Sequence, residues 1–350
     1  KEKNINLFKA QALFFPLMIL LIGLSNILVI YIGGLRYIAG EITIGVIAEF
    51  IMYVNMLTWP VAVVGWVTSI VQQAEASQKR INEFLKLEPE IKNTVESHTD
   101  ITGDITFKNV SFTYDDTNIK ALKEVSFNIK EGETLAILGK TGSGKSTILD
   151  LIGRLYDIDE GSIIINKTAI NEHNLTDLRN SIGYVPQDAF LFSDTIKNNI
   201  KYGKDNATDK EVIEAAKNAQ VHKNIIKFNN GYDTILGERG ITLSGGQKQR
   251  VSIARAIIKA PEILLFDDCL SAVDTETEEK ILNNLMKITK GKTSIIVSHR
   301  VSSAKNAHKI IVLDNGKIVQ EGTHDSLINI EGYYKHLYLK QLSETSSNKD

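Results

Sequence analysis

Residues 139–147, with the sequence GKTGSGKST, have the composition of a loop that binds phosphate groups. Glycines let backbone N–H groups turn toward anionic oxygens, and a helix that follows adds its positive N-terminal end. In such a loop Lys145 would carry a positive charge to the terminal phosphates of a nucleotide, and the Ser146 hydroxyl would ligate magnesium. The predicted nucleotide-binding residues of this loop are Gly139, Thr141, Gly142, Ser143, Gly144, Lys145, Ser146 and Thr147.

A magnesium ion held at such a loop needs a carboxylate at the end of a neighbouring strand. Residues 262–268, EILLFDD, provide an apolar run that ends in two acids. We assign Asp267 to the metal, directly or through water. Asp268 comes next, and a second acid at this position is a candidate for activating the water that attacks the nucleotide.

These residues require a framework of buried strands, and the apolar runs predict one. Four runs are continuously apolar, as expected for strands covered by helices on both faces. They are 134–138, 263–266, 294–298 and 309–313. Residues 104–114 and 123–133 instead alternate apolar and polar side chains, which indicates half-buried antiparallel strands. The sequence therefore predicts an α/β fold with an added antiparallel piece.

Two long uncharged stretches precede this α/β part. Residues 10–35 and 50–74 contain no charged side chain. About 20 apolar residues suffice for a helix to cross the hydrocarbon layer of a membrane. We predict membrane-spanning helices at about 10–35 and 47–72, the second continuing into the cytoplasm, with the lipid bilayer as a partner. Lysines and arginines outside these spans place both outer ends in the cytoplasm.

The composition also limits the classes of site and partner. Lys and Arg total 40 against 42 Asp and Glu, a net charge of −2, so we expect no nucleic-acid partner. The single cysteine, Cys269, allows no internal disulfide, and the scattered histidines suggest no zinc site. Because the chain starts at Lys1 without methionine or signal peptide, we interpret it as a fragment.

The same reading predicts four segments along the chain. Residues 1–84 would form a transmembrane part and 85–101 a polar linker, with Pro89 as a helix stop. Residues 102–343 would form the nucleotide-binding domain, and 344–350 a polar tail.

Residues 243–257, LSGGQKQRVSIARAI, predict a helix that begins after Ser244 as N-cap. Together with the phosphate loop, LSGGQ resembles the signature sequence of ATP-binding cassette (ABC) transporters. The resemblance covers the whole chain and implies a P-loop NTPase with a mixed-sheet core, an antiparallel β subdomain and an α-helical subdomain. The two apolar spans look like the last two transmembrane helices of an exporter-type half-transporter.

The resemblance implies ATP and Mg²⁺ as cofactors and assigns further roles. Tyr114 matches the aromatic that stacks on adenine, and Gln187 the glutamine that senses magnesium. His299 matches the histidine at the γ-phosphate. Asp274, in SAVD, matches the loop between paired cassettes. The signature residues, which contact ATP bound to a partner, are Leu243, Ser244, Gly245, Gly246 and Gln247. The segment expected to touch the coupling helices contains Glu238 and Arg239.

In this family two cassettes pack head to tail, so the resemblance implies a second half-transporter as partner. The residue after the magnesium aspartate is usually glutamate, and here Asp268 is one methylene shorter. A catalytic group misplaced by about 1 Å loses on the order of 100-fold in rate. We therefore expect this chain's own site to bind ATP and hydrolyse it slowly, as in the degenerate subunit of heterodimeric multidrug exporters. A homodimer in which Asp268 suffices is the alternative.

The resulting interpretation is an ATPase subunit of a membrane exporter, in a bacterial inner membrane by family resemblance. Asp268, His299 and Gln187 are its catalytic candidates, and Ser146, Gln187 and Asp267 its metal candidates. Two other interpretations are a membrane-tethered regulatory cassette with little turnover and a soluble cassette ATPase. The transported substrate is not predicted, because it depends on helices outside this sequence.

Overall fold

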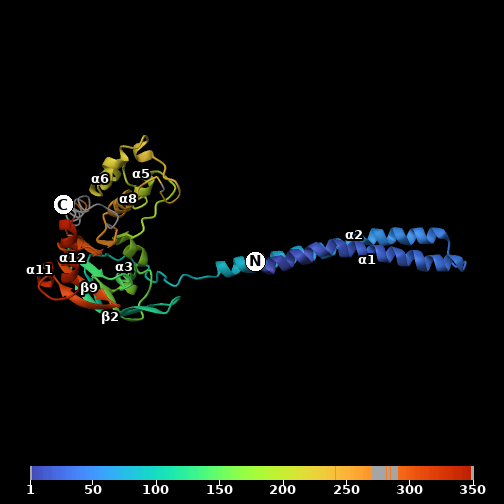
Figure 1. Cartoon of the computed structure of the whole chain (residues 1–350), viewed down its shortest axis with the longest axis horizontal. Coiled ribbons are helices and arrows are strands. Elements are labelled where there is room, and N and C mark those ends of the chain that lie inside the picture. Colours follow the sequence, from blue (N-terminus) through green and yellow to red (C-terminus); the bar gives the residue numbers. More distant parts are fainter. Residues whose placement is uncertain (1, 241, 270–280, 282–283, 285–290, 348–350) are drawn as a thin grey trace. The chain divides into compact units, whose positions relative to one another are not determined.

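The computed structural model describes residues 2–240, 242–269, 281, 284 and 291–347. The chain divides into two compact units, Lys1–Pro89 and Glu90–Asp350 (Figure 1). Each unit has its own pattern of burial, and each is described separately below.

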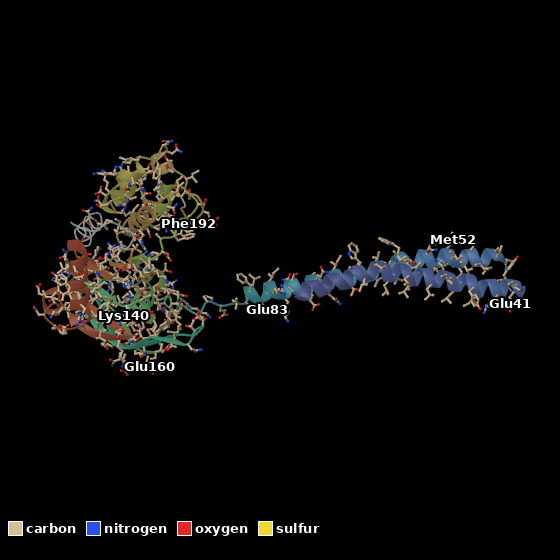
Figure 2. The ribbon with its side chains drawn as sticks, viewed as in Figure 1. Glu41, Met52, Glu83, Lys140, Glu160 and Phe192 are labelled. Atoms are coloured by element: carbon tan, nitrogen blue, oxygen red, sulfur yellow. The ribbon has the colours of Figure 1, made fainter. Side chains whose placement is uncertain are left out.

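The first unit is a hairpin of two long helices, α1 (Glu2–Ile38) and α2 (Ile44–Leu85), which pack against each other. Both extend beyond the stretches expected to cross a membrane, and the segments Pro16–Ile38 and Ile44–Leu85 are long and apolar enough to span one. Among the side chains described in these helices none is buried, and many apolar ones project outward, Met52 among them (Figure 2). Such a surface suits the hydrocarbon layer of a membrane.

The second unit is built on two sheets. The larger sheet has the strand order β10-β9-β3-β8-β7-β6, parallel except for the edge strand β10. Its strands are β3 (Thr134–Gly139), β6 (Ile182–Val185), β7 (Ile263–Asp267), β8 (Thr293–Val297), β9 (Lys309–Asp314) and β10 (Lys317–Gly322). The predicted apolar runs are its central strands, and every residue of β7 is buried. The α/β prediction is confirmed.

The smaller sheet has the order β2-β1-β4-β5 and is antiparallel, as the alternating pattern predicted. Its strands are β1 (Ile105–Tyr114), β2 (Ile119–Ile129), β4 (Glu160–Ile165) and β5 (Thr168–Ala169). Helix α3 (Lys145–Ile152) contributes Ile148, Leu149, Leu151 and Ile152 to one apolar core that the two sheets share. That core fixes the start of α3 beside the end of β3.

Most of the other described helices of this unit form two groups (Figure 1). A helical lobe around its own apolar core contains α5 (Ile196–Lys201), α6 (Asp209–Asn218), α7 (His222–Ile225) and α8 (Gly245–Ile257). Against β3 and β9 pack α10 (Val301–Ala304), α11 (His324–Leu327) and α12 (Tyr333–Ser347). Short 3₁₀ turns occupy Ile170–Glu172, Gly231–Asp233 and Glu238–Gly240.

The second half of the expected linker is hydrogen-bonded to α4 (Leu175–Ser181). Asn174 is the N-cap of α4, and its Oδ1 accepts from the N–H groups of Thr176 and Asp177 at 3.0 and 3.3 Å. Its Nδ2 donates to the carbonyl of Val95 at 2.7 Å. The carboxylate of Asp177 accepts from the backbone N–H of Thr99 at 2.9 Å. Residues 95–99 are therefore bound to the α/β unit.

We predict that Asn174→Ala lowers the free energy of unfolding of this unit by about 2 kcal/mol, because it removes a helix cap and a partly buried hydrogen bond. Pulse proteolysis of the purified chain in urea measures this value. Asn180→Ala, an exposed change on the same helix, is the matched control and should shift it by less than about 0.5 kcal/mol. Equal shifts in the two variants would contradict the prediction.

Candidate functional site

The loop 139–144 connects the end of β3 to the start of α3 and needs glycine at two crowded positions. Gly139 and Gly144 have φ angles of +149° and +100°. A Cβ at Gly139 would lie 2.3 Å from the carbonyl oxygen of Leu313, and one at Gly144 would lie 2.6 Å from that of Ala121. Only glycine fits where the backbone turns this tightly.

Lys145 is held inside this loop. Its Nζ donates to the carbonyls of Gly139 at 3.0 Å and Lys140 at 2.8 Å, and the residue is 6% exposed. Burial lowers the pKa of the Lys145 ammonium, and the nearby carboxylates of Asp268 and Asp267 oppose that effect. The loop therefore fixes a cation where a bound phosphate chain would pass.

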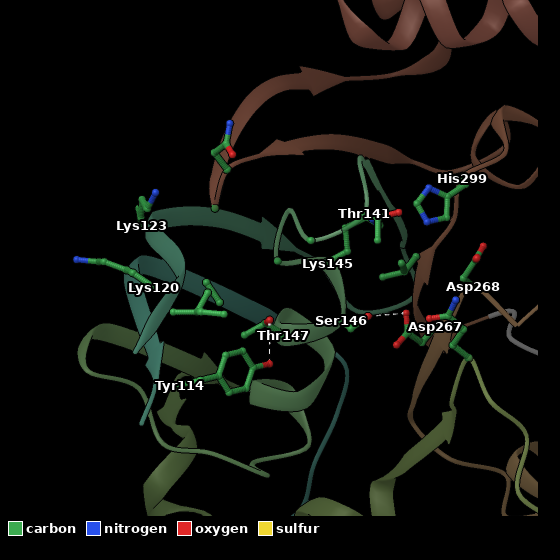
Figure 3. A pocket seen from close by; sticks show the side chains of 18 residues that line it. Tyr114, Lys120, Lys123, Thr141, Lys145, Ser146, Thr147, Asp267, Asp268 and His299 are labelled. Carbon is green, nitrogen blue, oxygen red and sulfur yellow. Dashed lines mark hydrogen bonds between the residues drawn. The ribbon is translucent and has the colours of Figure 1, made fainter. Parts of the chain in front are cut away.

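Ser146 lies in the first turn of α3, which follows β3, and Asp267 ends β7; β8 lies between these two strands. The Ser146 hydroxyl donates to Oδ1 of Asp267 at 3.0 Å (Figure 3). Burial raises the pKa of the Asp267 carboxyl, the hydrogen bond from Ser146 opposes this, and the charge of Asp268 raises it further. Burial and the charge of Asp267 likewise raise the pKa of Asp150, on α3, to about 6.

These oxygen donors fit Mg²⁺. Magnesium is usually held by one or two carboxylates, with water and substrate phosphates completing its shell. Within the described residues no cluster of three or more acidic, His or Cys side chains could hold a metal by itself. A hydroxyl and a carboxylate beside a phosphate loop, with neighbouring acids that repel one another, suit a cation that arrives with a nucleotide.

Asp268 and His299 follow the ends of β7 and β8. The N–H of Asp268 donates to the carbonyl of Val297 at 3.0 Å, which continues the pairing of the two strands. Asp268 has a φ of +41°, a left-handed conformation that aspartate tolerates better than most residues. Its carboxylate accepts a hydrogen bond from the backbone N–H of His299. Burial raises the pKa of the Asp268 carboxyl, and the charge of His299 opposes this.

Tyr114 lies at the end of β1 on the other side of the loop. Its hydroxyl is 3.1 Å from Oγ1 of Thr147 (Figure 3). Its ring makes T-shaped contacts with Phe112 and Tyr156, with centroids 4.9 and 5.4 Å away. Burial raises the pKa of the Tyr114 hydroxyl, and the hydrogen bond with Thr147 opposes this. Tyr114 also lines the cavity described below, where an aromatic ring could stack with a base.

One cavity of about 440 Å³ brings most of the predicted residues together. From the predicted set it is lined by Tyr114, Thr141, Gly142, Gly144, Lys145, Ser146, Thr147, Gln187, Asp267, Asp268 and His299. Gly139 and Ser143 belong to the same loop but do not line the cavity. The buried Oγ of Ser143 has no hydrogen-bond partner among the described atoms. The lining of the cavity thus combines the aromatic ring of Tyr114, the ammonium of Lys145 and the carboxylates of Asp267 and Asp268.

Sequence reasoning missed the rim of this cavity beside Tyr114. Ile119, Lys120, Ala121 and Lys123 of β2, Val297 of β8, and Asn315 and Gly316 of the β9–β10 turn also line it. The N–H of Lys123 donates to the carbonyl of Gly316 at 2.8 Å, which joins the two sheets at this rim. The turn sequence Asn-Gly signals a hairpin. Nothing in the sequence marks Lys120 or Lys123 as more than surface lysines.

The LSGGQ segment lies on the helical lobe, and none of residues 243–247, all within the described part of the chain, lines this cavity. Ser244 is the N-cap of α8, as predicted; it forms a capping box with Gln247, and Leu243 is buried. Gln249 of α8 donates through Nε2 to the carbonyl of Gln187 at 3.3 Å. Glu238 lies in a 3₁₀ turn before the signature, Arg239 follows it there, and Asp274 is outside the described residues.

Known proteins resemble both the sequence and the structure. A family model described as ABC transporter matches residues 122–271. The "Probable multidrug resistance ABC transporter ATP-binding/permease protein YheI" of Bacillus subtilis is 42% identical over 97% of this chain and 58% of its own length. The "Multidrug resistance-like ATP-binding protein MdlA" of Escherichia coli is 41% identical over 99% of this chain and 58% of its own. Residues 122–271 therefore form an ABC transporter ATP-binding domain, and the chain resembles these transporter proteins over nearly its whole length.

The fold is that of an ABC exporter. A solved structure of a bacterial Atm1-family ABC exporter with ATP bound matches with a TM-score of 0.79 and 35% identity, over 95% of this chain and 59% of that one. The chain spans between 58% and 59% of the length of these three relatives. An ABC ATPase domain binds ATP, and the loop, the aromatic ring and the carboxylates of the cavity suit that ligand.

We predict that Tyr114→Ala weakens ATP binding to this ABC domain about tenfold, because base stacking on an aromatic ring contributes on the order of 1–1.5 kcal/mol. Tyr114→Phe keeps the ring and loses only the contact with Thr147, so its affinity should stay within about twofold. Titration with a fluorescent ATP analogue measures both. Equal losses in the two variants would show that the hydroxyl, and not the ring, matters.

Proposed function

We propose that this chain is a subunit of an ATP-driven membrane exporter whose ATP sites form between two cassettes. The observation that carries the proposal is the division of the ATP-binding elements within one chain. The phosphate loop, Tyr114 and Asp267 line one cavity, whereas the LSGGQ segment lies apart from it on the helical lobe. A second cassette would supply the missing signature to this cavity and receive LSGGQ in exchange.

In the proposed ATP site, the residues of this chain divide the work of phosphoryl transfer. Lys145 and the loop N–H groups bind the phosphates, and Ser146 with Asp267 holds the magnesium ion. Mg²⁺, when bound with ATP, neutralises the charge that develops on the phosphates. Gln187 lines the same cavity and is hydrogen-bonded through its carbonyl to α8. Gln187 would therefore transmit the presence of bound ATP in the cavity to the helical lobe.

Asp268 is the candidate base, and its setting supports slow hydrolysis. Its carboxylate is short and is held by the backbone N–H of the neighbouring His299. A positioned base contributes about 10²–10⁴-fold to rate, and misplacement by about 1 Å forfeits much of this. The raised pKa of the Asp268 carboxyl makes it a stronger base. The length of its side chain, however, determines whether the carboxylate can contact the attacking water. We favour a heterodimer in which a partner subunit supplies a glutamate-containing site; a homodimer is the alternative.

The proposed location is a cell membrane, with α1 and α2 as two of several spanning helices and the cassette in the cytoplasm. The apolar, unburied surfaces of both helices support this and argue against a soluble ATPase. In the proposed exporter, further spanning helices would contribute to the choice of substrate. The names of the relatives refer to multidrug resistance, and one relative of Syntrophus aciditrophicus is an "ATP-dependent lipid A-core flippase", 39% identical over 95% of this chain. Drugs and lipids are therefore the first substrates to test.

We predict that the purified chain in lipid nanodiscs hydrolyses ATP slowly and that Asp268→Glu accelerates it at least tenfold. The added methylene extends the carboxylate toward the attacking water. Steady-state phosphate release measures the rate. Asp205→Glu adds the same methylene at an exposed position and should leave the rate within about twofold.

Brisk and equal rates in wild type and Asp268→Glu would contradict the slow-site proposal and favour a self-sufficient homodimer. ATP binding with no turnover in either protein would favour the regulatory cassette. Wild-type turnover that drives efflux of a drug or lipid from proteoliposomes would support the exporter.

A further inference from the structure

We propose that Gln341, in the middle of α12, is a positioning residue for the segment that carries His299. The inference rests on the proposed ATPase function and adds to it a contact from outside the cavity. Gln341 does not line the cavity, and no motif marks it. Its side-chain amide, however, binds the backbone on both sides of Arg300.

Two hydrogen bonds define the contact. Nε2 of Gln341 donates to the carbonyl of His299 at 2.9 Å, and the backbone N–H of Val301 donates to Oε1 of Gln341 at 2.9 Å. A carbonyl only accepts and an N–H only donates, so these partners determine which end of the amide is which. A side-chain amide offers both a donor and an acceptor, whereas Glu, when ionised, offers only acceptors and Lys or Arg only donors.

The contact supplies a cap that the local sequence lacks. Val301 is the first residue of α10, and the first N–H groups of a helix have no partner within it. The N-cap position is held by Arg300, whose side chain has only donors and cannot accept this hydrogen bond. Gln341 provides the acceptor from another helix. The backbone from His299 to Val301 therefore depends on α12 for its conformation.

Helix α12 is itself firmly anchored. Tyr334 is fully buried in a core shared with Val301 and Ala304 of α10, and its hydroxyl lies 2.7 Å from Nδ1 of His324. The N–H of Tyr334 also donates to the side chain of Gln320 on β10 at 3.1 Å. The helix that carries Gln341 is therefore held in place by core packing and by hydrogen bonds.

The braced segment continues directly into the catalytic candidates. The N–H of His299 donates to the carboxylate of Asp268, while its carbonyl accepts from Gln341. The Arg300 N–H donates to Oγ of Ser298 at 3.0 Å, which fixes the turn from the other side. A shift of this backbone would move the imidazole and the carboxylate together. Loss of the brace should therefore slow catalysis without weakening the contacts that bind ATP.

The test compares three variants of the purified chain in nanodiscs. Gln341→Met is similar in length and removes both hydrogen bonds; we expect kcat to fall about tenfold or more, with the KM for ATP within twofold of wild type. Gln341→Glu keeps the acceptor but loses the donor, and should lower kcat by a smaller factor. Leu339→Met places the same side chain at an exposed site of α12 and should change neither constant.

Amide hydrogen exchange gives a readout that does not require turnover. The N–H of Val301 should exchange at least tenfold faster in Gln341→Met and at the wild-type rate in Gln341→Glu and Leu339→Met. If wild type shows no turnover at all, the proposed ATPase function fails, and this exchange pattern still decides whether Gln341 holds the segment.

Three results would overturn the inference. The first is a kcat for Gln341→Met within twofold of wild type when wild type is active. The second is a joint change in kcat, KM and melting temperature, which would indicate a general loss of folding. The third is unchanged exchange at Val301.

Discussion

The hydrogen bond between Ser146 and Asp267 joins two parts of the chain that lie 121 residues apart, and the candidate site depends on it. It forms because β3 and β7 run parallel on either side of β8, so their carboxyl ends meet at one edge of the sheet. The strands hold this register because they are apolar on both faces and buried. The glycines of the loop then let the start of α3 approach the acid. Buried packing thus brings a hydroxyl and a carboxylate to the distance that a shared magnesium ion requires.

The parts of the site that a sequence could reveal are those whose chemistry forces a local pattern. Tight turns require glycines, so the phosphate loop was recognisable, and the capping box of Ser244 and Gln247 follows from the needs of a helix start. The apolar runs predicted the central strands for the same reason. Residues that act through tertiary contacts leave no such pattern. Lys120 and Lys123 resemble solvated lysines, Gln341 resembles any polar helix residue, and the hydrogen bonds of residues 95–99 with α4 depend on packing.

The proposed role of Asp268 would let one site bind a nucleotide well and hydrolyse it slowly. The groups proposed to bind ATP, from Tyr114 to Lys145, lie on different elements from the acid that would activate water. Under this proposal, a shorter carboxylate at position 268 would slow the reaction and leave ATP binding intact. The hydrogen bond from His299 and the brace from Gln341 place the same segment under the control of α12. Within a pair of cassettes, this arrangement would let one site hold ATP while the other completes the cycle.

The affinity for a nonhydrolysable ATP analogue, with Mg²⁺ and with EDTA, in wild type and Asp267→Asn tests the central claim most directly. Isothermal titration calorimetry of the purified chain gives all four values. If Ser146 and Asp267 hold the magnesium ion, Mg²⁺ raises the wild-type affinity at least tenfold and that of Asp267→Asn less than twofold, with equal affinities in EDTA. An Asp267→Asn variant that keeps the full magnesium enhancement would contradict the account.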